Sequence, residues 1–302
     1  MSKKISILLT GGTGLIGSEL SKSIVSTYGN LSVLYRERKL PIPGINWIKH
    51  DIGKDAINEL TDVLNETDIV VHNAACVKNG NTKSENDEIE AVNVNFTRNL
   101  LEKIAATKVK KIIFTSSYSF LKKPLPALIL EDSAIACNTT YSKSKYDGEE
   151  LIKAHALKYH INYNILRISS PVANDLNLMP DTVLKKWIIN SMAGEPIQVF
   201  GTGSRTQDFI SVTDIASAYM QCIHHQNISG TFNLGSGNPI SMLEIAKLIT
   251  NKFGNQYVFS GLDVNENDRW NIALGKIKEQ INFTPIYTSK EAVENLLSTI
   301  HQ

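Results

Sequence analysis

The chain has 302 residues, and its 31 lysines and arginines nearly balance its 30 aspartates and glutamates, which leaves a net charge of +1. This balance argues against nucleic acid and anionic membrane surfaces as partners, because both select strongly basic faces. With 42% hydrophobic residues and ordinary glycine and proline contents, the composition is that of a globular protein with a large core, which excludes disordered and fibrous classes.

The cysteines and the N-terminus favour a soluble cytoplasmic protein. Cys76, Cys137 and Cys222 are widely spaced and form no Cys-x-x-Cys pair, so they predict neither a disulfide framework nor a thiolate metal site, and we expect no metal. The first apolar run, Ile5–Leu9, is shorter than the ~7–15 apolar residues of a signal-peptide core. No run approaches the ~20 apolar residues of a membrane span.

Short apolar runs alternate with amphipathic stretches along the first half of the chain. This rhythm is typical of parallel strands joined by crossover helices, and it predicts an α/β fold with a Rossmann-type doubly wound parallel sheet. The predicted strands are Ile5–Leu9, Ser32–Tyr35, Asn46–Ile48, Ile69–Asn73, Lys111–Thr115 and Asn164–Ile168. The predicted helices are Leu15–Ser26, Asp55–Asn65, Glu88–Thr107 and Ser142–Tyr159, and the charged stretch Lys78–Glu90 is interpreted as a solvated loop and helix start.

The alternation becomes irregular after Ser169, which predicts a second, smaller lobe. Two later segments regain strand and helix character and are expected to return to the sheet, so the lobes interleave. The breaks are Pro171, Pro180, Pro196 and the turn Gly201–Ser204, and the returning segments are Asp208–His224 and Gly230–Leu234. We therefore predict a dinucleotide-binding domain over residues 1–169, to which 208–240 return, and a substrate-binding lobe made of 170–207 and 241–302.

A glycine-rich loop, Thr10-Gly-Gly-Thr-Gly-Leu-Ile-Gly17, follows the first predicted strand and opens the first helix. Its glycines permit a tight turn, close approach of backbone N–H groups to a pyrophosphate, and close helix–strand packing, and no P-loop lysine is present. The loop predicts dinucleotide binding; an ordinary strand-to-helix turn is the alternative. The expected cofactor contacts are Gly11, Thr13, Gly14, Leu15, Ile16 and Gly17.

The end of the second strand bears on the choice between NAD and NADP. NAD enzymes normally place Asp or Glu there, whereas this chain has Arg36 and Arg38 on either side of Glu37. An arginine can pair with a 2′-phosphate, which favours NADP(H), while Glu37 keeps NAD(H) open and surface arginines are a third interpretation. Asp51 and Ile52 after the third strand are candidates for the adenine site, and a loop-capping role is the alternative for Asp51.

Tyr141 and Lys145 supply the candidate reacting group. They lie four residues apart, on one face of a predicted helix. A phenol has a pKa of ~10, and a nearby ammonium is expected to lower it. Ser117 ends the fifth strand, where it would face the cofactor crevice and hydrogen-bond a substrate oxygen while Tyr141 moves the proton. A chance pair on a helix surface is the alternative.

Taken together, these residues resemble the extended short-chain dehydrogenase/reductase family, the NAD-dependent epimerases and dehydratases that act on nucleotide sugars. The resemblance covers almost the whole chain. Further matching segments are Val71–Ala75, Asn93–Asn95, Leu166–Arg167, Asp208–Asp214 and Asn233–Gly237.

The resemblance implies hydride transfer, with Tyr141 as acid and base, Lys145 on the nicotinamide ribose and Ser117 polarising the carbonyl. It also implies that Asn93 marks a helix kink that supports the proton path. His72 is interpreted as structural, since the family assigns it no proton. Ala74, Ala75 and Pro171 would line the cofactor. The helices that carry Asn93 and Tyr141 would pair with those of a second subunit, so a homodimer is expected.

The residues after Ser117 discriminate among the family's reactions. Similar 4,6-dehydratases have Asp-Glu there and decarboxylating relatives a Glu, but this chain has Tyr118 and Ser119, which disfavours both. A nucleotide-sugar 4-epimerase and a 4-keto-sugar reductase remain. The arginines at 36 and 38 tilt the choice toward the reductase, because net reduction uses NADPH. A non-catalytic NADP(H) sensor is the alternative from another class.

The substrate side departs from the family pattern. Gln207 replaces the arginine that often clamps a diphosphate, so Arg205 and Arg269 are the candidates for that role, and Ser170 replaces a common asparagine. A nucleotide diphosphate sugar is the expected substrate, with exposed solvated arginines as the alternative.

Two tryptophans and one long loop complete the candidates. Trp187 and Trp270 are expected to pack in the small lobe, although stacking on a base or sugar is open. Leu121–Thr140, between Ser117 and Tyr141, either closes over the substrate or is an ordinary surface loop.

Overall fold

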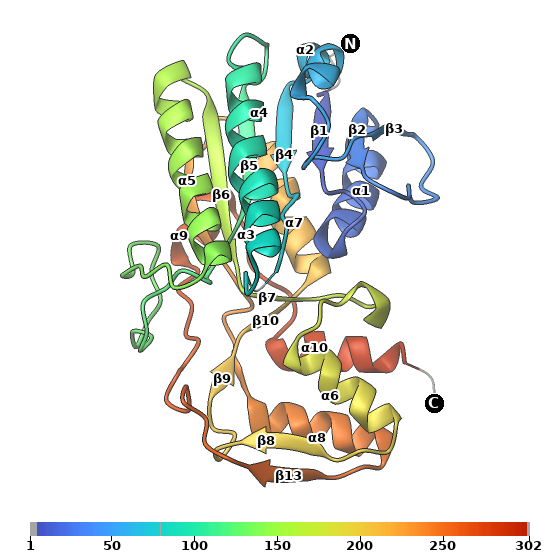
Figure 1. The fold of residues 1–302 in the computed structure, drawn as a ribbon, viewed down its shortest axis with the longest axis vertical. Helices are drawn as coiled ribbons and strands as arrows, with labels where there is room; N and C mark the ends of the chain where they lie inside the picture. Colours follow the sequence, from blue (N-terminus) through green and yellow to red (C-terminus); the bar gives the residue numbers. More distant parts are fainter. Residues whose placement is uncertain (1–4, 79, 301–302) are drawn as a thin grey trace.

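The computed structural model describes residues 5–78 and 80–300, and a seven-stranded parallel sheet organises the larger lobe (Figure 1). The strand order is β11-β6-β5-β4-β1-β2-β3, and every neighbouring pair is parallel. The strands are β1 Ile7–Thr10, β2 Leu31–Tyr35, β3 Ile45–Lys49, β4 Ile69–His72, β5 Lys111–Ser117, β6 Asn162–Ile168 and β11 Gly230–Leu234. The predicted Rossmann-type doubly wound fold is confirmed.

Helices cover both faces of this sheet, as the doubly wound fold requires (Figure 1). One buried apolar cluster joins the strands to α1 Leu15–Tyr28 and α7 Val212–His224, and a second joins them to α2 Thr61–Glu66, α4 Phe96–Ile104 and α5 Thr140–Tyr159. The apolar strand runs arise because both faces of a central parallel strand are buried.

Helix α9, Gly275–Ile281, departs from the predicted division of the chain. Its Ile277 and Ile281, with Phe283 after it, are buried in the same cluster as α1 and α7. The assignment of 241–302 to the substrate lobe therefore does not hold for this helix. A short helical run between two loops gave no sequence signal for the side on which it packs.

The helix predicted over Glu88–Thr107 is three consecutive pieces. It begins earlier, with α3 Lys83–Ile89 capped by the Thr82 side chain, continues as the π-helical segment η2 Glu90–Asn95, and ends as α4. In the stretch 78–90, interpreted as a solvated loop and helix start, the helix thus begins at Lys83 and not at the predicted Glu88. The helix predicted over 55–65 is likewise divided into the 3₁₀ turn η1 Ile57–Leu60 and α2.

The smaller lobe has its own apolar core. Helices α6 Val183–Met192, α8 Met242–Phe253 and α10 Ser289–Ser298 surround it. Three two-stranded sheets and a 3₁₀ turn complete the lobe: β7 Ser170–Val172 with β10 Phe209–Ser211, β9 Thr206–Gln207 with β12 Ile240–Ser241, β8 Ile197–Phe200 with β13 Tyr257–Ser260, and η3 Leu176–Leu178. Across the described ranges, no helix combines the length and apolarity that a membrane crossing needs.

One buried carboxylate fixes the junction between the lobes. Asp208 accepts hydrogen bonds from the Ser169 hydroxyl at 2.6 Å, from the Ser236 backbone and hydroxyl at 2.8 Å each, and from the Gly237 N–H at 2.9 Å. Burial raises the pKa of Asp208, while these hydrogen bonds favour the ionised form. The ends of β6 and β11 are therefore held against the smaller lobe.

Candidate active site

A cavity of about 540 Å³ opens at the carboxyl ends of the central strands. The register brings the ends of β1 and β4 level, because Thr10 pairs with His72. Strands β5 and β6 end level with each other at the Ser117–Ile168 pair and extend beyond β4, because His72 pairs with Phe114. Here the strand order reverses, which is where open α/β sheets bind ligands. The predicted residues that line it are Gly11, Thr13, Gly14, Leu15, Ile16, Arg36, Asp51, Ile52, Ala74, Ala75, Ser117, Tyr141, Lys145 and Pro171.

The glycine loop is shaped to receive an anion. A Cβ on Gly11, whose φ is +68°, would lie 2.7 Å from Ala74 Cα, and one on Gly17 would lie 2.0 Å from Gly11 O. Gly14 caps α1 without a side-chain hydrogen bond, and the first turn carries no acidic residue. The N–H groups of that turn are thus free to face a pyrophosphate, so the loop fits a dinucleotide. Gly17 packs beneath the loop and does not line the cavity.

The two arginines after β2 differ in position. Arg36 lines the cavity, and its Nε lies 3.3 Å from Glu37 Oε1 in an exposed ion pair. Arg38 is exposed and is not part of the described cavity wall. Asp51 lines the cavity, and its Oδ1 accepts a hydrogen bond from Gly53 N at 3.2 Å, so the adenine-site and loop-capping interpretations both stay open.

The reacting residues meet at the other side of the cavity. Thr139 and Ser142 form a capping box that begins α5 and places Tyr141 in its first turn. The Tyr141 hydroxyl is hydrogen-bonded to the Ser117 side chain. Lys145 is buried one turn further along α5, and its Nζ lies 4.6 Å from the centroid of the Phe114 ring.

The pKa of the Tyr141 phenol is shifted in the direction opposite to the one predicted from the sequence. Burial raises the pKa of Tyr141 to about 12, although the hydrogen bond from Ser117 opposes this. Burial also lowers the pKa of Lys145 to about 8. The desolvation of both groups thus outweighs any help that the ammonium gives the phenolate.

Asn93 lies in the π-helical segment η2, where the resemblance placed a kink. Its Oδ1 accepts from Cys76 N at 2.7 Å, and its Nδ2 donates to Cys76 O at 3.1 Å and to Ser144 Oγ at 2.9 Å. Asn93 therefore ties the segment after β4 to the first turns of α5, without lining the cavity itself.

His72 is held as a structural residue. Its Nδ1 lies 2.8 Å from Thr10 Oγ1 and its Nε2 lies 2.8 Å from Thr97 Oγ1. Burial, and secondarily the charge of Lys145, lowers the pKa of His72 to about 3. The neutral imidazole has both nitrogens engaged, which fits the structural interpretation.

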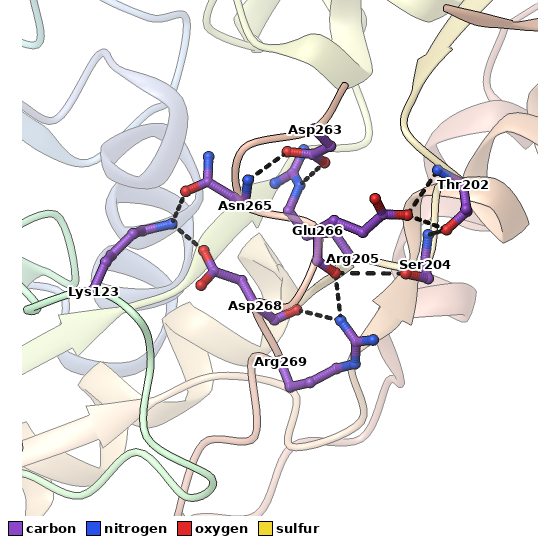
Figure 2. Close-up of polar contacts among 9 residues, drawn as sticks. All are labelled: Lys123, Thr202, Ser204, Arg205, Asp263, Asn265, Glu266, Asp268 and Arg269. Carbon is purple, nitrogen blue, oxygen red and sulfur yellow. Dashed lines mark hydrogen bonds and ion pairs between the residues drawn. The ribbon is translucent and has the colours of Figure 1, made fainter. Parts of the chain in front are cut away.

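The predicted diphosphate ligands lie away from this cavity wall. Arg205 Nε is 2.9 Å from Asp263 Oδ2, and Arg269 Nη1 donates to Glu266 O and Asp268 O at 2.8 and 3.0 Å (Figure 2). Ser170 accepts a hydrogen bond from Gln207 Nε2 at 2.7 Å. Both arginines are thus engaged by the chain, and their diphosphate role stays a prediction.

The aromatic candidates pack in the protein. Trp187 is buried in the core of the smaller lobe, and Trp270 lies edge-on to the buried Tyr118 at 5.9 Å between ring centroids. The long loop is anchored too, because Ile129 N donates to Asn271 O at 2.7 Å and Lys123 contacts Asp268 (Figure 2). The interpretation as an ordinary, docked surface loop is favoured over a closing lid.

Several residues that line the cavity were not predicted from the sequence. Asn73 donates from Nδ2 to Gly11 O at 3.2 Å and accepts from Thr115 Oγ1 at 3.0 Å, which fixes the glycine loop to β5. Ser169 follows β6 directly, and this strand-end position was a usable signal. Leu178 and Pro180 reach the cavity from the smaller lobe, so only the fold brings them there.

The chain matches one family model and is similar to several known proteins. The model of the "NAD dependent epimerase/dehydratase family" matches residues 7–235. The chain is 27% identical to a putative UDP-glucose 4-epimerase of Methanocaldococcus jannaschii, over 97% of both chains, and 24% identical to a dTDP-4-dehydro-6-deoxyglucose reductase of Escherichia coli, over 99% of this chain and 98% of that one.

Solved structures show the same fold. MoeE5 in complex with UDP-glucose and NAD superposes with a TM-score of 0.85 at 22% identity, covering 97% of this chain and 98% of that one. UDP-N-acetylglucosamine 4-epimerase from Bacillus cereus superposes with a TM-score of 0.81 at 22% identity, covering 99% and 100%.

Proposed function

The chain belongs to the NAD dependent epimerase/dehydratase family, and we propose that it is an NAD-dependent 4-epimerase of a UDP-linked sugar. The observation that carries the proposal is that Ser117, Tyr141 and Lys145 share one cavity with the glycine loop. The helix that this loop opens, α1, has no side-chain cap at its N-terminus. UDP and NAD are inferred from relatives, which include UDP-glucose 4-epimerases and a MoeE5 complex with UDP-glucose and NAD.

The side chains have distinct roles in the proposed reaction. A bound nicotinamide dinucleotide supplies the acceptor, and then the donor, of a hydride at C4 of the sugar. In its ionised form, Tyr141 takes the proton from the C4 hydroxyl during oxidation and returns it during reduction, while Ser117 hydrogen-bonds the same oxygen. With a dinucleotide bound, Lys145 would place its positive charge beside the cofactor ribose. Because the 4-keto sugar turns between the two steps, the configuration at C4 inverts.

The residue that follows Ser117 argues against dehydration and decarboxylation. Tyr118 packs against Trp270 and contributes no carboxyl group beside Ser117. Neither an Asp nor a Glu is therefore present at the position where such relatives hold their extra acid or base.

The 4-keto-sugar reductase that the sequence favoured remains the second candidate. Its support is that Arg36 lines the cavity and that one relative is a 4-keto-sugar reductase. Arg36→Asp is expected to weaken NADP(H) binding at least tenfold if the arginine holds a 2′-phosphate. Arg38→Asp, outside the described cavity wall, is the matched control. Equal NADP(H) affinities of both variants and the wild type would remove the cofactor argument for a reductase.

The deciding experiment starts with the cofactor that the purified protein retains. We expect NAD⁺ or NADH in the denatured supernatant, and many turnovers of UDP-glucose to UDP-galactose without added cofactor. Freely exchanging NADP(H), with NADPH oxidised by 4-keto nucleotide sugars and no epimerisation, would instead establish the reductase. A chain that binds a dinucleotide but converts no sugar would contradict both enzymes.

A further inference from the structure

A histidine with unpaired nitrogens is buried directly after β3. The His50 side chain has 0% exposed surface, and neither Nδ1 nor Nε2 has a hydrogen-bond partner among the residues that the structure describes. Buried polar groups are nearly always paired, because an unpaired one loses its hydration without compensation. This imidazole therefore points to a partner that the protein chain alone does not supply.

Two carboxylates face the orphaned nitrogen. Glu59 Oε2 lies 3.7 Å from His50 Nδ1 and Asp55 Oδ2 lies 4.0 Å from it, both beyond hydrogen-bond length. All three atoms lie within 4.8 Å of one another. Asp55 is also positioned by the backbone, since its Oδ2 accepts a hydrogen bond from Asp51 N at 2.6 Å.

We propose that His50 Nδ1, Asp55 and Glu59 bind a divalent transition-metal cation such as Zn²⁺. Zinc bonds to imidazole nitrogen and carboxylate oxygen are about 2.0–2.2 Å long, so tetrahedral ligands lie about 3.4 Å apart. The two distances from Nδ1 need to shorten only slightly to reach that spacing. A 2+ charge also neutralises the two carboxylates, and the imidazole ligand selects against Mg²⁺, which prefers oxygen.

The site adjoins the cofactor cavity without being part of the reacting centre. His50, Asp51, Ile52 and Gly53 all line the cavity. Asp55 holds the backbone of Asp51, so a cation on Asp55 would fix this part of the wall. The proposal does not depend on which sugar the protein acts on.

Zinc titration of the metal-stripped full chain tests the site. The background is Cys137→Ser, because Cys137 is an exposed thiol that could bind zinc by itself. By calorimetry we expect one Zn²⁺ per chain, not displaced by excess Mg²⁺. Glu59→Gln and His50→Gln should each weaken binding at least tenfold. Asp62→Asn, an exposed acid on the adjoining helix, is the control and should bind as the background does.

The Glu59 variant keeps the test decisive if His50→Gln fails to fold, because the Glu59 side chain is 60% exposed. A dissociation constant weaker than about 100 μM for the background protein would overturn the proposal. So would Glu59→Gln binding zinc as tightly as the background, since the metal would then lie elsewhere. If the His50 ring is instead paired directly with the two carboxylates, without metal, the dissociation constant for zinc should be weaker than about 100 μM.

Discussion

Lys145 is a buried amine whose charge opposes folding. Its exposed fraction is 3%, burial lowers its pKa to about 8 from an ordinary 10.5, and the Glu149 carboxylate opposes that shift. The protein retains this cost at the centre of its candidate active site. Such a conflict between stability and local chemistry is typical of a functional group.

Removing this charge should stabilise the chain in a pH-dependent way. Below pH 8 the Lys145 amine is protonated in both the folded and the unfolded state, so the full cost of burying its charge is present. Between pH 8 and 10.5 the amine is protonated mainly in the unfolded state, so this cost disappears as the pH rises. Lys145→Met should therefore raise the free energy of unfolding at pH 7 by on the order of 3 kcal/mol, with the difference shrinking toward pH 10. Urea unfolding at both pH values measures it.

Lys143→Met is the matched control for that measurement. Lys143 lies on the same helix with 66% of its side chain exposed, so its replacement should change stability by less than about 0.5 kcal/mol at either pH. A stability difference between Lys145→Met and wild type that does not vary with pH would contradict the buried charge.

At the scale of elements, a buried ion pair fixes α5 to the sheet. Glu149 of α5 accepts from Arg167 of β6 through both carboxylate oxygens, at 2.9 and 2.8 Å, and from Ser116 of β5 at 2.6 Å. Arg167 Nη1 also donates to Glu131 O at 2.6 Å, in the long loop before α5. The helix that carries Tyr141 and Lys145 is thus oriented by a network one turn beyond Lys145 and two turns beyond Tyr141.

Breaking this pair should unfold the protein at lower denaturant concentration. Glu149→Gln leaves Arg167 buried without a full countercharge, so we expect the free energy of unfolding to fall by about 3–5 kcal/mol in urea. Glu150→Gln, one residue along and exposed, should cost less than about 1 kcal/mol. Equal effects of the two substitutions would show that the buried pair does not anchor α5.

The strands could be predicted from the sequence, whereas one helical segment could not. The strands were predictable because buried parallel strands are continuous apolar runs with glycine or polar residues at their ends. The π-helical segment was not predictable from periodicity, because its position coincides with two hydrogen bonds between Asn93 and Cys76, which lies 17 residues earlier in the chain. Only the resemblance indicated a kink there.

For the whole molecule, the sequence predicted the residues of the central cavity better than those of its substrate side. The glycine loop, Ser117 and Tyr141 follow strands or open helices, so local pattern places them. The partner of Arg205 is Asp263, which is 58 residues away in a segment without a pattern of its own, and no local signal connects the two. The homodimer and the cytoplasmic location stay predictions.

The central claim is that Tyr141 moves a proton at the sugar carbon from which hydride leaves. Its most direct measurement compares Tyr141→Phe with Tyr159→Phe, an exposed tyrosine at the end of the same helix. We predict that Tyr141→Phe binds the dinucleotide as the wild type does but lowers kcat for the UDP-sugar by about 10²–10⁴-fold, while Tyr159→Phe retains full turnover. Full turnover by Tyr141→Phe, with the cofactor bound, would contradict the account.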